Sequence, residues 1–471
     1  MSEGGDDYRI ERDSLGEIEV PADAYWGAQT QRAVANFPIS GITFSRRFVR
    51  ALGVVKKAAA RANRELGLID ERQADAIVDA ADEVIAGDHD DQFPVDVFQT
   101  GSGTSSNMNA NEVIANRAAE LLGQEIGDRV VHPNDHVNYG QSSNDVIPTA
   151  MHVAALEAAQ KDVIPALETL AAELEAKEAE FDDAVKTGRT HLQDATPVRL
   201  GQEFGGYRTQ VEKGVARVKS TTDRLAELAL GGTAVGTGLN THPEFPELAA
   251  EYIAEETDLP FREADDHFEA QAAHDAMSEA HGALRVVAGS LNKIANDLRL
   301  LASGPRNGLG ELDQPENQPG SSIMPGKINP VVAEAVNQVH KQVVGNDAAV
   351  SAGAAEGQID LNLYKPVIAH NYLESAGMLA NASEAFAETF VAELEADRAG
   401  MEAQVEQSMA LATALNPTIG YDKASKVAKQ ALAEGKTVKE VVVSEGYLSE
   451  DEAEQVLDPE RMTHRGILGE E

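Results

Sequence analysis

A long heptad run between residues 273 and 301 is the feature that most restricts the fold of this chain. A continuous helix of this length exceeds about 40 Å, at roughly 1.5 Å per residue. Because apolar residues occupy both seam positions, such a helix must pack along a partner of similar length. The sequence therefore predicts a helical bundle. The seam residues are Ala273, Met277, Ala280, Leu284, Val287, Leu291, Ile294, Leu298 and Leu301.

Helical periodicity covers most of the remaining chain. Apolar residues follow a helical period in residues 48–65, 70–85, 146–302 and 331–352. Shorter helical patterns begin near residue 394. With 471 residues the chain can form more than one domain. We expect a mainly α protein of three domains, comprising residues 1–140, 141–393 and 394–471.

The charge is strongly negative. The chain holds 79 Asp and Glu against 39 Lys and Arg, a formal net charge of −40. This excess disfavours nucleic acid and anionic membranes as partners. It also repels an anionic substrate, except where molar salt shortens the Debye length to about 3 Å. We interpret the acidity as adaptation to a salt-rich cytoplasm; an ordinary acidic protein is the alternative.

Cysteine is absent, which excludes disulfides, thiolate catalysis and zinc–thiolate sites. The segment 1–7 is acidic and lacks a signal-peptide pattern, and no run of about 18 apolar residues occurs. We therefore expect a cytoplasmic protein without a membrane partner.

The segment 320–330, GSSIMPGKINP, combines small residues, two prolines and one cation between helical stretches. Its irregular backbone leaves amide groups free to bind an anion, and Lys327 adds a positive charge. Such donors would stabilise the alkoxide of a serine, so Ser321 and Ser322 are candidate bases. The alternative is a solvated linker.

Hydroxyl and amide side chains precede predicted helix starts at residues 99–109 and 141–145. The first turn of a helix offers free N–H donors and a positive dipole end, which suits a carboxylate ligand. Simple helix capping is the alternative for both segments.

Two further residues are candidates for acid–base chemistry. His191 lies in residues 187–197, which we expect to form a loop between helices, and histidine has a pKa near neutrality. Glu334 occupies the first turn of the helix predicted from residue 331. It could pair with a histidine, or it could only stabilise the helix dipole.

Three histidines recur every seven residues, at His267, His274 and His281. This spacing is too long for one metal ion without other ligands, so we expect them on an exposed helix surface and expect no metal site. The glycine-rich segment 230–239 follows a helical period rather than a strand, which argues against a dinucleotide site.

Taken together, several blocks resemble, in order, those of class II fumarases within the fumarase/aspartase superfamily of lyases. The resemblance implies three mostly helical domains and a homotetramer with a twenty-helix core. It also implies active sites built from three subunits, a small dicarboxylate substrate, and no metal or organic cofactor. The blocks are residues 21–32, 101–116, 132–145, 188–202, 231–240, 320–330 and 416–422.

The resemblance also implies roles for single residues. Ser321 matches the base that removes a C3 proton from malate, and His191, polarised by Glu334, matches the acid that assists departure of hydroxide. Lys327 and Asn329 match the groups that stabilise the aci-carboxylate. Substrate contacts match Ser102, Gly103, Thr104, Ser142, Ser143, Asn144, Thr190, Ser322, Lys327, Ile328 and Asn329, and a second anion site matches Arg129, His132, Pro133, Asn134 and Asp135.

Aspartase is the nearest alternative, because it shares the fold and the signature loop. Its loop usually reads Pro-Ala-Lys where this chain has Pro-Gly-Lys at 325–327, and it usually has Ser-Thr-Asn where this chain has Ser-Ser-Asn at 142–144. Both differences favour fumarase. An inactive scaffold is a further alternative, although Ser321, His191 and Lys327 are all present. The Tyr139-Gly140 pair replaces a usual Lys-Ser, which weakens the match at the second anion site.

Overall fold

A computed structural model describes residues 8–466 of the chain. The expectation that residues 1–7 are not a signal peptide concerns residues outside the described part. The described chain is mainly helical, as predicted, with a few short two-stranded sheets. Within it, no helix combines the length and the apolar character needed to cross a membrane.

The chain divides into two compact units. The first comprises Met1–Pro165, Ala216–Ala288 and Lys341–Ala380, and the second comprises Ala166–Val215, Gly289–His340 and Asn381–Glu471. The three-domain division expected from the sequence stays a prediction.

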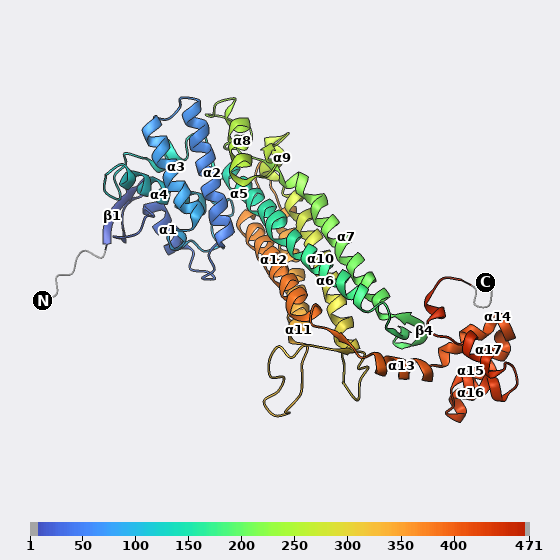
Figure 1. Ribbon diagram of the computed structural model, residues 1–471. Helices are drawn as coiled ribbons and strands as arrows, with labels where there is room; N and C mark the ends of the chain where they lie inside the picture. The colour runs from blue at the N-terminus through green and yellow to red at the C-terminus, as the bar shows by residue number, and fades with distance from the viewer. Residues whose placement is uncertain (1–7, 467–471) are drawn as a thin grey trace. The chain divides into compact units, whose positions relative to one another are not determined.

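In the first unit, helix α2 packs against α3, α5 and α8 (Figure 1). Its apolar residues Phe48, Leu52, Val55 and Ala59 follow the spacing of one helix face, and all are buried. Asp70 caps α3 by accepting a hydrogen bond from the amide of Arg72. The elements are β1 (Tyr8–Asp13), β2 (Gly16–Pro21), α1 (Ala28–Asn36), α2 (Arg46–Glu65), α3 (Glu71–Ala86), α4 (Thr104–Leu121), α5 (Ser143–Ala158), α8 (Phe245–Thr257) and α9 (His267–Ala272).

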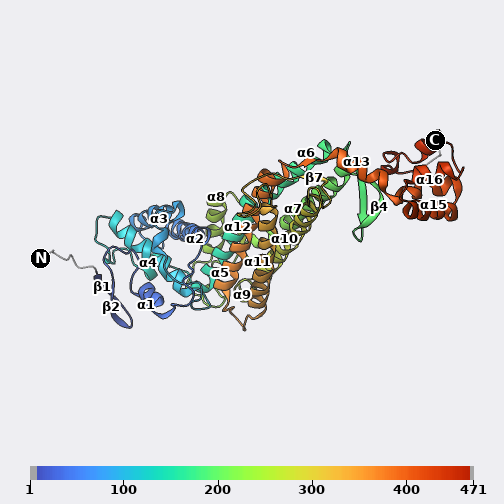
Figure 2. The ribbon, with the colours of Figure 1, turned by 90° about the horizontal axis from the view of Figure 1, so that it is seen from below.

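The second unit contains an antiparallel hairpin of β3 (Val185–Thr190) and β4 (Gln193–Arg199). The strand β3 packs against α13 (Arg398–Gln407), and the tip of the green hairpin projects from the ribbon in Figure 2. The expectation of a loop between helices at residues 187–197 was wrong. Thr190 pairs with Gln193, so His191 and Leu192 form a two-residue turn, and both have positive φ, 55° and 59°. This geometry matches the right-handed twist of a hairpin, although the sequence lacks the Asn-Gly that usually signals it.

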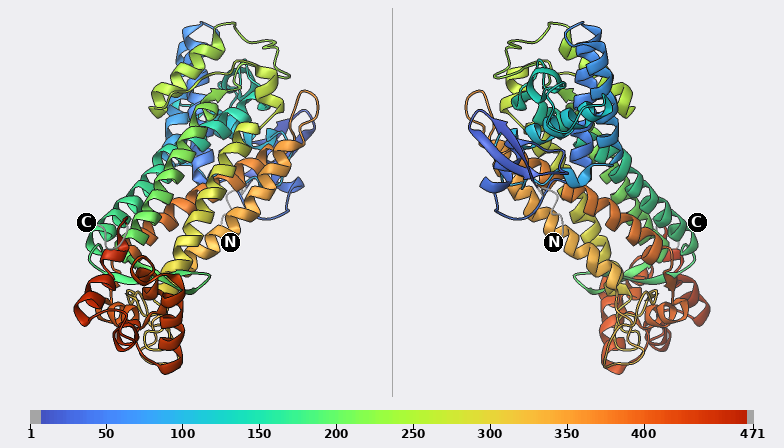
Figure 3. Two further views of the ribbon diagram at one scale, coloured as in Figure 1. Left: turned by 90° about the vertical axis from the view of Figure 1, so that its right-hand side faces the viewer. Right: turned by 90° about the vertical axis from the view of Figure 1, so that its left-hand side faces the viewer.

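The chain forms five further long helices: α6 (Ile164–Glu180), α7 (Leu200–Leu225), α10 (Asp275–Leu301), α11 (Val331–Ala355) and α12 (Lys365–Phe386). Within each unit their segments run side by side (Figure 3). The seam from Met277 to Leu301 is buried, which confirms the prediction from the heptad run. Ala273 is the exception, because it follows the end of α9 and precedes α10.

The prediction that His267, His274 and His281 lie on an exposed helix surface was wrong. His267 belongs to the separate helix α9, and both His274 and His281 are buried. Each of these two lies three residues before a seam residue, so it shares the inward face of the chain. The ring of His281 lies 2.9 Å from Asp347 Oδ1 and 2.9 Å from Ser375 Oγ.

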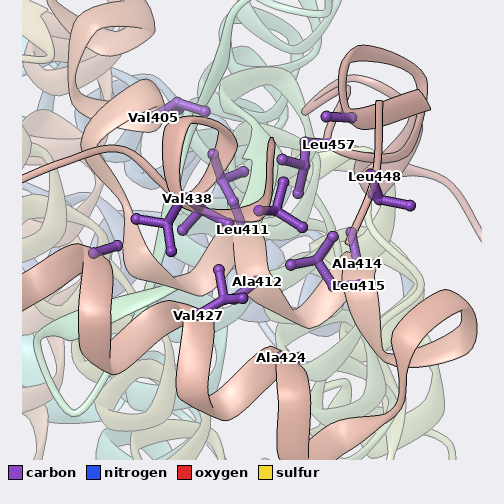
Figure 4. Packing of buried hydrophobic residues seen from close by; sticks show 14 residues of the cluster. Val405, Leu411, Ala412, Ala414, Leu415, Ala424, Val427, Val438, Leu448 and Leu457 are labelled. Atoms are coloured by element: carbon purple, nitrogen blue, oxygen red, sulfur yellow. The ribbon is translucent and has the colours of Figure 1, made fainter. Parts of the chain in front are cut away.

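Short helices follow residue 394, as predicted. Their apolar side chains converge in a small core that includes Val405, Leu411, Leu415, Val427 and Val438 (Figure 4). Capping boxes start two of these helices, at Thr437 and Ser449. The elements are β7 (Leu312–Asp313), β8 (Glu395–Ala396), α13 (Arg398–Gln407), α14 (Asn416–Ile419), α15 (Tyr421–Glu434), α16 (Val438–Ser444) and α17 (Glu450–Val456).

Candidate active site

A chain of hydroxyl groups joins the starts of α4 and α5 in the first unit. Ser102 Oγ lies 2.7 Å from Thr104 Oγ1, which lies 2.7 Å from Ser143 Oγ. Gly103 precedes α4 with φ +76°, and a Cβ there would lie 2.9 Å from the Ile147 side chain. Glycine therefore allows the two helix starts to approach each other. Four of the predicted substrate contacts, Ser102, Gly103, Thr104 and Ser143, come together here.

The start of α5 carries two more of the predicted substrate contacts, Ser142 and Asn144. Ser142 Oγ accepts a hydrogen bond from the Asn144 amide at 3.2 Å, and Asp145 accepts one from the Ser142 amide at 2.9 Å. The other Asp145 oxygen accepts from the Gly231 and Thr233 amides. The glycine-rich segment 230–239 thus binds this carboxylate. Burial raises the pKa of Asp145 to about 6.

Two buried lysines of this unit were missed by the sequence analysis. Lys56 Nζ donates to Asn138 Oδ1 and Gln141 Oε1, both at 2.9 Å. Lys365 Nζ donates to the Asn144 carbonyl at 3.3 Å. Both side chains are fully buried, and burial lowers the pKa of each to about 7. The signal for Lys56 was its place on the buried face of α2, between Leu52 and Ala59.

Residues of the expected second anion site form a tight turn, Pro133–Val137, in the same unit. His132 Nδ1 accepts hydrogen bonds from the amides of Asn134 at 3.2 Å and Asp135 at 3.1 Å. A nitrogen that accepts from two amides cannot also donate to the Asp135 carboxylate 3.2 Å away, so this contact is not a hydrogen bond. The guanidinium of Arg129 donates to the Arg12 carbonyl.

In the second unit, the segment 320–330 is irregular, as predicted. Ser321 Oγ accepts hydrogen bonds from two loop amides, those of Ile323 at 3.2 Å and Met324 at 3.0 Å. Two N–H donors aimed at one serine oxygen stabilise negative charge on it.

Hydrogen bonds from side chains to backbone carbonyls hold this loop closed. The Asn329 side chain donates to the Gly320 carbonyl, and the Gln314 side chain donates to the Ile328 carbonyl at 3.3 Å. A Cβ at Gly320 would lie 1.8 Å from the Lys327 carbonyl oxygen, so only glycine allows this approach. The Ser322 and Lys327 side chains are exposed.

Three candidates remain, two on the β3–β4 hairpin and one on α11. Thr190 and His191 are exposed at the tip of the β3–β4 hairpin. Glu334 lies in the first turn of α11, 3.9 Å from the Arg299 guanidinium. Over residues 8–466, no hydrogen bond or ion pair joins His191 to Glu334. In the same range, no group of three or more His, Asp or Glu side chains could hold a metal ion.

Comparison with known proteins identifies the family of this chain. A family model described as "Lyase" matches residues 16–345, and one described as "Fumarase C C-terminus" matches residues 411–464. A class II fumarate hydratase of Halobacterium salinarum is 84% identical over 463 residues, covering 98% of each chain. The chain belongs to the class II fumarate hydratase family. The corresponding enzyme of Nitrosomonas europaea is 54% identical over 97% of this chain and 99% of its own.

Solved structures place the fold in the same family. The class II fumarase of Schistosoma mansoni superposes with a TM-score of 0.94 at 40% sequence identity, covering 97% of this chain and 99% of its own. A fumarate lyase of Brucella melitensis also has a TM-score of 0.94, at 48% identity over 97% of this chain and all of its own. The fumarate hydratase fold therefore extends over nearly the whole chain.

Proposed function

We propose that this chain is a fumarate hydratase that reversibly eliminates water from L-malate to give fumarate. The Ser321 oxygen, held by two amides of the signature loop, is the observation that carries the proposal. A C–H next to a carboxylate is a weak acid, so its removal needs a base and stabilisation of the resulting charge.

In the proposed reaction, the Ser321 alkoxide takes the C3 proton of malate. The C–H electron pair moves into the adjacent carboxylate, which becomes an aci-carboxylate stabilised by Lys327 and Asn329. Collapse of this intermediate forms the C2–C3 double bond and breaks the C2–O bond. His191, assisted by Glu334, gives the departing hydroxide a proton, which releases water and fumarate.

Substrate carboxylates suit the hydroxyl groups at the starts of α4 and α5. Ser102, Thr104 and Ser143 already form one hydrogen-bonded chain, and hydroxyls can redirect their protons toward an anion. Both helix starts also present the positive end of a dipole. Ser142, Asn144, Thr190 and Ser322 are proposed as further contacts, and residues 129–135 as a second anion site.

One assay separates this function from its alternatives. Purified protein in molar KCl is given L-malate, L-aspartate or argininosuccinate, and fumarate is followed by its ultraviolet absorbance. We expect product from malate alone. Fumarate from aspartate would favour an aspartase, and the absence of any product from a folded protein would favour an inactive scaffold.

We further propose a cytoplasmic homotetramer with three domains per chain and active sites shared between chains. The family resemblance supports the assembly, and the acid-rich composition suits a salt-rich cytoplasm. Co-assembly of His191→Asn with Ser321→Ala should restore partial activity, because some sites would then receive both native residues. Verified mixed tetramers without recovered activity would contradict shared sites.

A further inference from the structure

A buried carboxylate lies beside strand β3 of the hairpin that carries His191. Glu311 has no exposed surface, and it precedes the short strand β7 in the second unit. Its Oε1 lies 2.6 Å from Arg189 Nη1, and its Oε2 lies 3.2 Å from Lys186 Nζ. Both cations belong to β3, so one carboxylate holds this strand at two points.

Such an attachment helps to fix the hairpin, whose strands also pack against α13 and the short helices Met409–Leu415 and Arg461–Thr463. Two strands without a third are marginally stable in water. The turn adds strain, because His191 and Leu192 both adopt left-handed backbone conformations, which are unfavourable at a non-glycine residue. Surrounding contacts must therefore hold the His191 turn in place.

Glu311 is itself held firmly. Its amide donates to the Leu301 carbonyl at 2.9 Å, and its carbonyl accepts from the Asp397 amide at 3.1 Å. A second link runs through Gln404, which accepts from Arg189 Nη2 at 3.1 Å and donates to the Leu309 carbonyl at 2.8 Å. Arg189 is thus fixed on two sides, two residues before His191.

We propose that Glu311 is a positioning residue for His191, acting through Arg189 and Lys186 on β3. Loss of this carboxylate leaves both cations without their shared partner and lets the hairpin tip move. A misplacement of 1 Å far from the reacting atoms can lower turnover by about 10²-fold. The proposal rests on the proposed function, in which His191 supplies a proton.

The test compares Glu311→Gln with Glu203→Gln in malate turnover. Glu203 Oε1 lies 3.0 Å from the same Lys186 Nζ, but Glu203 has no contact with Arg189 among the described residues, so it is a matched control. We expect Glu311→Gln to lower kcat by about 10- to 100-fold and Glu203→Gln by less than about 3-fold. Equal effects of the two substitutions, or wild-type kcat in folded Glu311→Gln, would overturn the proposal.

A double variant separates positioning from general stability. If Glu311 acts through His191, then adding Glu311→Gln to His191→Asn should lower the remaining activity by less than about 3-fold. The same 10- to 100-fold loss in both backgrounds would overturn the proposal. If Glu311→Gln does not fold, Arg189→Lys replaces it in the same cycle, because it keeps the cation and removes the Gln404 contact. Wild-type protein without malate turnover would instead contradict the proposed function.

Discussion

Neighbouring serines in the signature loop differ in their contacts. Ser321 accepts two amide hydrogen bonds, whereas Ser322 is exposed. We expect Ser321→Ala to lower kcat by roughly 10²–10⁴-fold, because it removes the proposed base while leaving the core untouched. Ser322→Ala should raise KM more than it lowers kcat, since its hydroxyl is assigned to substrate binding. Steady-state kinetics of both variants tests these roles, and the reverse pattern would exchange them.

Lys56 provides a test based on pH. Its pKa is about 7 in the folded chain against 10.5 for a free lysine, so the unfolded state binds more protons between these values. Stability should therefore rise with pH in this window, by up to about 1.4 kcal/mol per unit for this residue. Lys56→Met should lose that part of the slope, measured as the unfolding free energy in urea at pH 7, 8 and 9.

The adjacent Lys57 is the control for this measurement. Its ammonium lies 2.7 Å from Asp82 and 2.6 Å from Glu256, and its pKa is raised by these carboxylates although burial opposes them. It therefore titrates above the window, and Lys57→Met should keep the wild-type pH slope between pH 7 and 9. Equal slopes in wild type and Lys56→Met would show that Lys56 stays charged when the chain is folded.

The signature loop as an element depends on close backbone approach at Gly320. Because a Cβ would lie 1.8 Å from the Lys327 carbonyl oxygen, Gly320→Ala must open the loop. We expect turnover to fall by about 10²-fold or more as Ser321 moves, with little change in the melting temperature because the loop is largely exposed.

Gly206, inside α7, is the control for this substitution, because a Cβ there would meet nothing within 4 Å. Gly206→Ala should keep full activity and raise the unfolding free energy by about 0.5–1 kcal/mol, since alanine favours a helix. If Gly320→Ala remained fully active, then the closed loop would not be needed for catalysis.

For the molecule as a whole, the net charge of −40 predicts stability that depends on salt. At about 10 mM ionic strength the Debye length is about 30 Å, so acidic groups repel one another across the surface; molar KCl screens them. We expect the melting temperature to fall steadily as KCl is lowered from molar to millimolar concentration. Sucrose, which is excluded from protein surfaces but carries no charge, should restore much less of the lost stability. A melting temperature independent of KCl would contradict adaptation to salt.

The amino-acid sequence by itself determined the helical class, the long seam of α10 and the family, because periodic burial and short motifs are local properties of the chain. It also located Ser321 and the hydroxyls near Thr104 and Ser143, although their hydrogen bonds needed coordinates. Tertiary structure alone decided the hairpin at His191. Its turn uses residues without strong turn preference, and contacts to Glu311, more than 100 positions away in the chain, hold it.

Tertiary packing also determines which charged and titratable groups are buried. Lys365 lies at the start of α12 without a clear inward pattern in the sequence, and only the packing of distant helices removes it from water. Asp145 belongs to the capping box that starts α5, yet its second oxygen binds amides of the segment 230–239. A local pattern predicts which face of a helix turns inward; it does not predict which distant backbone will supply the partners of a buried charge, because that depends on how the helices pack.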